Sequence, residues 1–270
     1  MPAGFRAPEN MARRAAALLG AAAVAITTLA TLEPSQAIDA AQPQPIGPGG
    51  TWTQVFGDEF NGTAIDQTKW DPNWFGEGGV MNDVPTHASN VLVKNGRLFL
   101  RLSKQTNGRV TGGLVRTTYK AGRYQLRPGE FVEARMRFEG DDVEDIYNWP
   151  AWWASGQNWP VAGEHDIAEG LGGRLKTNYH YRDAAGVHRQ RSKTAPAGGW
   201  GDRWHTFGLH RKASSADVYW DGKLVNSYPT SDNGGPEELI INVGKPRNDP
   251  RPMRFGYANG VRIEYVRAWR

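Results

Sequence analysis

The stretch Gly163-Glu164-His165-Asp166-Ile167-Ala168-Glu169-Gly170 decides how this chain is interpreted. Side chains alternate between the two faces of a strand, so Glu164 and Asp166 share one face and Glu169 falls on the other. One extra residue at Ile167 or Ala168, a β-bulge, returns Glu169 to the face of the other two and bends the strand. Three like charges on one face repel each other, and this cost is usually tolerated where the charges perform chemistry. The stretch therefore predicts a bulged strand that carries a chemical site.

Short strands and turn residues surround this stretch. The run from Val91 to Leu102 places β-forming residues on both sides of Asn95-Gly96, a dipeptide typical of two-residue hairpin turns. Further strands are expected at residues 129–138, at 217–225 around Asp221-Gly222, at 238–243 and at 261–269. The sequence after residue 51 contains no amphipathic helix of ordinary length and no internal repeat. The pattern predicts an all-β fold, a sandwich of two sheets.

The first 50 residues have a different composition. Arg6, Arg13 and Arg14 precede an apolar run over residues 15–30, and small residues follow up to Ala37. This pattern predicts a secretory signal peptide over residues 1–37, cleaved near Ala37, and Arg13-Arg14 also allows twin-arginine export. Residues 38–50 predict a Pro/Gly linker, and residues 51–270 predict the folded domain. We therefore expect a secreted protein that does not stay in a membrane, because the apolar run is too short to span one.

The composition narrows the range of partners. The formal net charge is +4 and the basic residues are scattered, so we expect no binding to nucleic acid. The chain has no Cys, so a secreted form depends on its core, or on a metal, for stability. It has 11 Trp, and this surplus suits flat platforms for sugar rings as well as the space between two sheets.

Two carboxyl groups are what hydrolysis of a glycosidic bond requires. One protonates the leaving oxygen, while the other attacks the anomeric carbon or activates a water, and in retaining enzymes the two lie roughly 5–5.5 Å apart. On a bulged strand, Glu164 and Glu169 are two long side chains that lean toward each other over the shorter Asp166. The spacing alone also fits a solvated acidic face, so it does not decide the chemistry.

The order of motifs along the chain resembles glycoside hydrolase family 16, the β-jelly-roll enzymes that include laminarinases, licheninases, agarases and carrageenases. The matching segments cover nearly the whole chain after the leader and are Phe56–Thr63 with Lys69-Trp70, Asn90–Leu98, Gly113–Arg116, Gly129–Arg135, Trp149–Trp153, Trp204–Leu209, Asp221–Lys223 and Tyr265–Arg267. The resemblance implies a concanavalin-like jelly roll with an open substrate cleft. It also implies that Glu164 is the nucleophile, Glu169 the acid/base and Asp166 their electrostatic helper. His165 stands where the family usually has Ile or another apolar residue, and Ala168 is smaller than the usual Met or Leu. Both are expected behind the cleft, where a buried His needs a partner.

The candidate sugar-binding residues lie on both sides of this strand. Trp149 and Trp153 share one face and are predicted to form a sugar platform, whereas Trp152 is expected in the core. His180, on the next strand, is expected to contact Glu169 or a sugar hydroxyl. The remaining candidates are three aromatic residues in loops and two cleft residues that the resemblance implies: Trp74, Trp159, Trp200, Asn90 and Arg116. Each has a structural alternative, a core or loop contact.

The resemblance also implies a structural calcium ion, which would brace a fold without disulfides. The matching positions are Glu59, Gly96 through its backbone carbonyl, and Glu264. The family usually has Asp at the last position, and the longer Glu leaves the site shifted or absent. Catalysis itself is expected to require no cofactor.

These observations predict a retaining endo-glycosidase, a monomer whose partner is a polysaccharide, with β-1,3-glucan as the default substrate. An agar-, carrageenan- or other galactan-type substrate stays open because four arginines follow the catalytic strand: Arg174, Arg182, Arg189 and Arg191. Transglycosylation stays open as well, since it shares the covalent step. A non-catalytic carbohydrate-binding lectin is the alternative of another class, and the intact Glu164 and Glu169 argue against it.

Overall fold

The computed structural model describes residues 42–76, 78–142 and 144–270. The predicted signal peptide and the first part of the predicted linker, residues 38–41, lie outside the described residues. The compact unit begins at Gln42, so the rest of the predicted linker belongs to it, although these residues form no strand. Hydrogen bonds hold this segment, from Trp269 Nε1 to the Pro43 carbonyl at 2.6 Å and from the Ile46 amide to Glu133 Oε2 at 3.0 Å.

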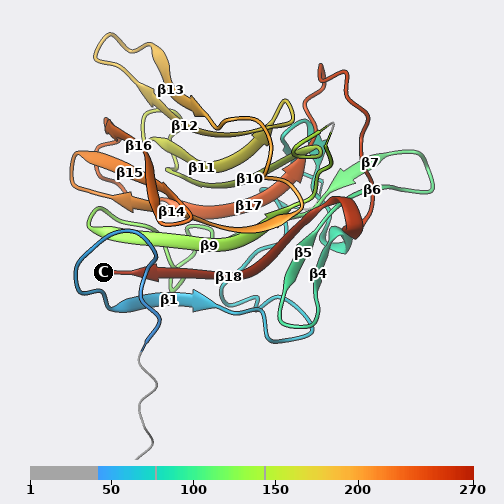
Figure 1. Ribbon diagram of the computed structural model, residues 1–270, viewed down its shortest axis with the longest axis horizontal. Coiled ribbons are helices and arrows are strands. Elements are labelled where there is room, and N and C mark those ends of the chain that lie inside the picture. Colours follow the sequence, from blue (N-terminus) through green and yellow to red (C-terminus); the bar gives the residue numbers. More distant parts are fainter. Residues whose placement is uncertain (1–41, 77, 143) are drawn as a thin grey trace, which may run out of the picture. The chain divides into compact units, whose positions relative to one another are not determined.

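Two antiparallel sheets form the folded unit, one packed on the other (Figure 1). Within the described residues the larger sheet has eight strands, in the order β16-β15-β14-β9-β18-β5-β4, with β1 paired to β18. Their bounds are β1 (Gln54–Asp58), β4 (Val91–Val93), β5 (Leu98–Leu100), β9 (Glu130–Phe138), β14 (Arg203–Arg211), β15 (Ser215–Trp220), β16 (Lys223–Pro229) and β18 (Val261–Trp269).

The smaller sheet contains the carboxylate-rich strand. In the described part of the chain it has six strands, in the order β13-β12-β11-β10-β17-β8. Their bounds are β8 (Leu114–Arg116), β10 (Trp149–Ser155), β11 (Glu164–Leu171), β12 (Arg174–Arg182), β13 (His188–Thr194) and β17 (Glu238–Gly244). Two short hairpins, β2 (Val80–Met81) with β3 (Val84–Pro85) and β6 (Leu102–Lys104) with β7 (Val110–Gly112), and two single 3₁₀ turns, Ala88–Asn90 and Tyr257–Asn259, accompany the sheets. None of the described segments is a helix long and apolar enough to span a membrane.

The predicted hairpin turns are confirmed. Asn95 and Gly96, between β4 and β5, have φ of 53° and 67°. Asp221 and Gly222, between β15 and β16, have φ of 47° and 73°. Two consecutive residues at positive φ are what a two-residue hairpin of type I′ requires, and Asn, Asp and Gly reach this region with little strain.

Side chains from both sheets fill the space between them. Trp152 of β10 is fully buried, as predicted, and its Nε1 donates to the Phe207 carbonyl in the opposite sheet at 3.2 Å. Trp220 of β15 donates in the same way to the Ile167 carbonyl of β11 at 2.9 Å. These hydrogen bonds between the sheets hold β10 and β11 against the larger sheet. The prediction of an all-β sandwich of two sheets is confirmed.

Candidate active site

The predicted bulge is present in β11. Ile167 is the extra residue in the pairing of β11 with β10, and the pairing with β12 shifts at the same place. Ile167 and Ala168 are fully buried in the core, whereas Glu164, Asp166 and Glu169 line one cavity. The bulge therefore brings all three carboxylates to one face of the sheet, as their spacing predicted.

The cavity that these carboxylates line has a volume of about 850 Å³. Its walls come from β10, β11, β12, β13 and β17 and from residues 74–75, 81–82, 119, 156–157 and 159. Aromatic and acidic side chains dominate the lining, and they are Trp74, Phe75, Tyr119, Trp149, Trp153, Trp159, Glu164, Asp166, Glu169 and Glu238. No Lys or Arg belongs to this lining among the described residues.

Hydrogen-bond donors are distributed unevenly between the two glutamates. Trp149 Nε1 donates to Glu169 Oε2 at 2.7 Å, and Asn178 Nδ2 donates to Glu169 Oε1. Glu164 accepts no hydrogen bond from the described residues, and its Oε1 lies 3.8 Å from His180 Nε2. The donors therefore favour the ionised form of Glu169 over that of Glu164 in the free protein.

All three carboxyl groups hold their protons more tightly than ordinary carboxyls. Burial raises the pKa of Glu164 and of Asp166 well above the usual range, and the nearest negative charge raises each further. Burial also raises the pKa of Glu169, although the indole N–H of Trp149 acts against it. The raised pKa values favour a protonated carboxyl in this group, and a general acid needs such a carboxyl. The roles that the resemblance implies require a proton on Glu169, whereas the donors in the free protein favour an ionised Glu169.

His180 joins the carboxylates from β12. Its Nε2 lies 3.4 Å from Asp166 Oδ2, and its Nδ1 lies 2.9 Å from Nε2 of His188. The indole of Trp159, which is 50% exposed, packs on His188 with the ring centroids 4.9 Å apart. His180 lines the cavity, but it faces Asp166 and not the predicted partner Glu169.

Trp149 and Trp153 both line the cavity, as their spacing predicted. Trp153 is 5% exposed, donates its Nε1 to Asn242 Oδ1 at 2.8 Å and packs against Trp74 with the ring centroids 5.9 Å apart. Trp153 and Trp74 therefore build the wall of the cavity. Trp149 is less deeply buried and contacts a carboxylate directly.

Comparison with solved structures identifies the fold. One similar structure comes from work on endo-acting O-glycanases, which prominent members of the human gut microbiota express to initiate mucin breakdown. The two chains are 25% identical, with a TM-score of 0.68, over 84% of this chain and 94% of that one. This chain is 22% identical, with a TM-score of 0.65, to the catalytic domain of an endo-1,3-beta-glucanase (laminarinase) from Thermotoga petrophila RKU-1, over 82% of this chain and 98% of that one. It is 22% identical, with a TM-score of 0.63, to a glycoside hydrolase family 16 endo-glucanase from Bacteroides ovatus, over 79% and 99%. The fold is that of glycoside hydrolase family 16. No protein-family model and no curated protein sequence matches the chain.

Asn90 does not reach the cavity of this family 16 fold, and its predicted contact with sugar is wrong. Its side chain is fully buried, with Nδ2 donating to Thr111 Oγ1 at 2.8 Å and Oδ1 accepting from Arg101 Nε at 3.2 Å. Both polar ends are thus satisfied inside the protein, which is a structural role. Trp200 is also structural, because it packs on Trp220 with the ring centroids 5.3 Å apart and is absent from the cavity lining.

Arg116 lies behind the cavity wall, and its predicted contact with sugar hydroxyls is replaced by a supporting role. It is 6% exposed, and its Nε lies 3.0 Å from Glu238 Oε2. Its guanidinium also lies over the rings of Trp74 and Phe75, at 4.9 Å and 4.5 Å from their centroids. Arg116 therefore positions three residues that do line the cavity, Glu238, Trp74 and Phe75.

Glu238 is a cavity residue that the sequence-based prediction missed. It lies opposite Ser155 of β10, and Ser155 in turn lies opposite Glu164 of β11. Burial raises the pKa of Glu238 to about 7, although the charge of Arg116 acts against this. Alternation along β17 could have indicated its position, because Glu238 and Asn242 share a face and two polar residues on one face of an apolar strand point to a polar surface.

The carboxylates predicted to hold calcium are engaged with arginines. Glu59 forms a bidentate pair with Arg267, at 2.7 Å and 2.8 Å. Glu264 pairs with Arg135 at 2.6 Å and with Arg97 at 3.4 Å. These guanidinium groups balance the two carboxylates, and a calcium ion would have to displace them. The calcium site stays a prediction, and no catalytic step depends on it.

Proposed function

We propose that the chain is a retaining endo-glycosidase that cleaves internal β-linkages of a neutral polysaccharide, with β-1,3-glucan as the first substrate to test. The bulged strand β11 carries this proposal, because it turns three carboxyl side chains into one cavity of a family 16 fold. Two of the similar structures are described as endo-glucanases, one of them as an endo-1,3-beta-glucanase. Their likeness in fold supports an endo-acting glycosidase.

The charge of the cavity lining favours a neutral substrate. Four carboxyl side chains line the cavity, whereas none of its described lining residues is Lys or Arg. A sulfated galactan would bring further negative charge to this surface and would be repelled. The four arginines that follow the catalytic strand are engaged elsewhere. Arg174 and Arg182 donate to backbone carbonyls, Arg189 pairs with Asp183, and Arg191 lies over the ring of Tyr181. A neutral galactan is therefore the second candidate, ahead of carrageenan.

In the proposed reaction, Glu164 attacks the anomeric carbon while Glu169 protonates the departing glycosidic oxygen. The bond to the leaving sugar breaks as an ester bond to Glu164 forms. Glu169, now ionised, removes a proton from the water that attacks the same carbon, and the sugar leaves with retained configuration. Trp149 Nε1 and Asn178 Nδ2 stabilise Glu169 once it has given up its proton. Asp166 between the two glutamates keeps their proton affinities apart.

We assign the binding of sugar rings to aromatic side chains at the cavity. Trp159 and Phe75 expose 50% and 77% of their surface, and both belong to the lining together with Trp149 and Trp153. A sugar ring that stacks on such a surface removes apolar area from water. Secretion, which the predicted leader implies, would bring the enzyme to polymers outside the cell.

A panel of purified polysaccharides tests the proposal: laminarin, lichenan, agarose, carrageenan, β-1,3-galactan and a neutral O-glycan. We expect wild type to release oligosaccharides of several lengths from laminarin, with the β-anomer formed first in ¹H NMR spectra. Glu164→Ala should release none and still bind the polymer. Products longer than the substrate would indicate transglycosylation, and binding without products in wild type would indicate a lectin. Full activity in Glu164→Ala, or an initial α-anomer, would contradict the mechanism.

A further inference from the structure

His165 lies on the core side of β11, between two carboxylates that face the cavity. Its side chain is fully buried and stacks on Tyr179, with the ring centroids 4.7 Å and the planes 17° apart. Its Nδ1 lies 3.0 Å from the hydroxyl of Tyr228. An apolar side chain would fill this place without any polar partner. The imidazole therefore has a role beyond filling the core.

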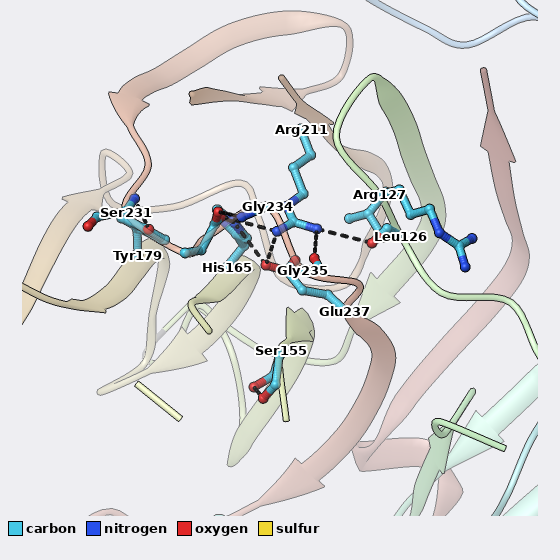
Figure 2. Close-up of polar contacts among 12 residues, drawn as sticks. Leu126, Arg127, Ser155, His165, Tyr179, Arg211, Ser231, Gly234, Gly235 and Glu237 are labelled. Carbon is cyan, nitrogen blue, oxygen red and sulfur yellow. Dashed lines mark hydrogen bonds and ion pairs between the residues drawn. The ribbon is translucent and has the colours of Figure 1, made fainter. Parts of the chain in front are cut away.

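The other side of the ring meets a buried set of charges (Figure 2). His165 Nε2 lies 3.5 Å from Asp232 Oδ2 and 3.4 Å from Glu237 Oε1. Arg211 Nη2 reaches the same two oxygens at 3.3 Å and 3.2 Å. The four charges balance only when the imidazole is protonated. Burial opposes that charge, but Glu237 and Asp232 outweigh it and raise the pKa of His165 to about 9.

This charged group ties β11 to the rest of the sandwich. Asp232 and Glu237 belong to the segment between β16 and β17, which crosses from the larger sheet to the smaller one. Arg211 is the last residue of β14 and donates to the carbonyls of Leu126 and Gly235, at 3.1 Å and 2.6 Å. The segment also packs closely where β11 begins, since a Cβ on Gly163 would lie 2.7 Å from the Cβ of Asp232.

We infer that His165 is a positioning residue whose buried imidazolium, held by Asp232 and Glu237, fixes the catalytic strand and offsets the repulsion between Glu164 and Asp166 on the opposite face. This inference rests on the proposed function, because offsetting the repulsion serves catalysis only if Glu164 is the nucleophile. The imidazolium acts on the proposed nucleophile from the core side, in addition to His180 on the cavity side.

The need for this charge follows from the surroundings of Glu164. The described part of the cavity lining offers no Lys or Arg, and Glu164 accepts no hydrogen bond from the described residues. Burial raises the pKa of Glu164, and the charges of Asp166 and Glu169 raise it further. The charge of His180 acts against them from the cavity side, and the charge of His165 adds to it from the core side. The titratable and charged groups that face His165 from the elements packed on it are Asp232, Glu237, Arg211, Tyr179 and Tyr228.

Titration of the free protein tests the inference without any substrate. The Glu164 carboxyl is followed by ¹³C NMR, with Glu164→Gln to assign its signal, in wild type, His165→Gln and Tyr228→Phe. We expect the midpoint of Glu164 to rise by about one pH unit in His165→Gln, because a unit charge is lost from a poorly solvated site. It should stay within about 0.3 unit in Tyr228→Phe, which loses a contact of the ring but keeps its charge. The acid limb of kcat/KM should move with the midpoint.

An unchanged Glu164 midpoint in folded His165→Gln would reduce His165 to a structural residue and overturn the inference. Should that variant fail to fold, the ¹⁵N shifts of the His165 ring in wild type decide the matter. They should report imidazolium at pH 7.5, and a neutral ring would overturn the inference. Failure of the proposed function is distinguishable, because wild type would then turn over no polysaccharide while both NMR measurements still gave an answer.

Discussion

Replacing Glu238 by Gln measures the cost of a fourth carboxyl in the cavity wall. The side chain is 4% exposed, and burial raises its pKa from 4.5 to about 7 although Arg116 Nε lies 3.0 Å away. Because the folded-state pKa lies above the unfolded value, the stability that the protonated form contributes is complete below pH 4.5 and is lost as the pH rises through 7. A difference of about 2.5 pH units, at about 1.4 kcal/mol each, corresponds to about 3 kcal/mol. Wild type should therefore lose about 3 kcal/mol of stability relative to Glu238→Gln between pH 4.5 and pH 8.

Urea unfolding of both proteins at the two pH values measures this loss. The change in their difference with pH is the quantity of interest, because contacts of the side chain that do not depend on its charge cancel in it. Tyr119→Phe is the matched control, since the Tyr119 hydroxyl accepts from the Glu238 amide at 3.3 Å and its removal leaves the carboxyl in place. The control should keep the pH dependence of wild type. A difference between wild type and Glu238→Gln that is equal at both pH values would refute the reasoning, because Arg116 would then compensate the burial fully.

Three further substitutions test the site and the core. Trp149→Phe removes a donor to Glu169 and should raise the pKa of that carboxyl. The alkaline limb of the pH profile of kcat/KM should therefore move to higher pH. Movement of the acid limb instead would make Glu169 the nucleophile. Trp152→Ala should lower the free energy of unfolding by about 3–5 kcal/mol in urea, and a loss below about 1 kcal/mol would contradict its place in the core. Asn90→Ala should cost about 1–3 kcal/mol by leaving buried partners unsatisfied while KM stays unchanged, whereas a raised KM would restore the predicted sugar contact.

The bulged strand could be predicted from the sequence because its signal is local. Alternation has a period of two, so the spacing of Glu164, Asp166 and Glu169 requires one extra residue if all three serve one site. The hairpin turns at Asn95-Gly96 and Asp221-Gly222 were predictable for the same reason, since two adjacent residues determine the backbone geometry of such a turn.

The remaining features depend on partners that are distant along the chain. Asn90 was expected in the cleft, but its place is set by Thr111 and Arg101, which no local pattern connects to it. The partners of His165 come from the segment between β16 and β17 and from the end of β14, so the sequence indicated only that a buried imidazole needs some partner. Sequence patterns determine the face on which a side chain lies, whereas packing between sheets determines what it meets there.

Trapping the covalent intermediate tests the central claim most directly. A 2-deoxy-2-fluoro glycoside with a good leaving group forms the glycosyl ester faster than water removes it, so the ester accumulates. The account predicts a mass increase of one fluoroglycosyl unit in the peptide that contains β11, located on Glu164 by fragmentation and absent from Glu164→Gln. A label on Glu169 would reverse the proposed roles, in agreement with the donors that Trp149 and Asn178 direct at that residue. No label, together with products of inverted configuration, would contradict a retaining mechanism altogether.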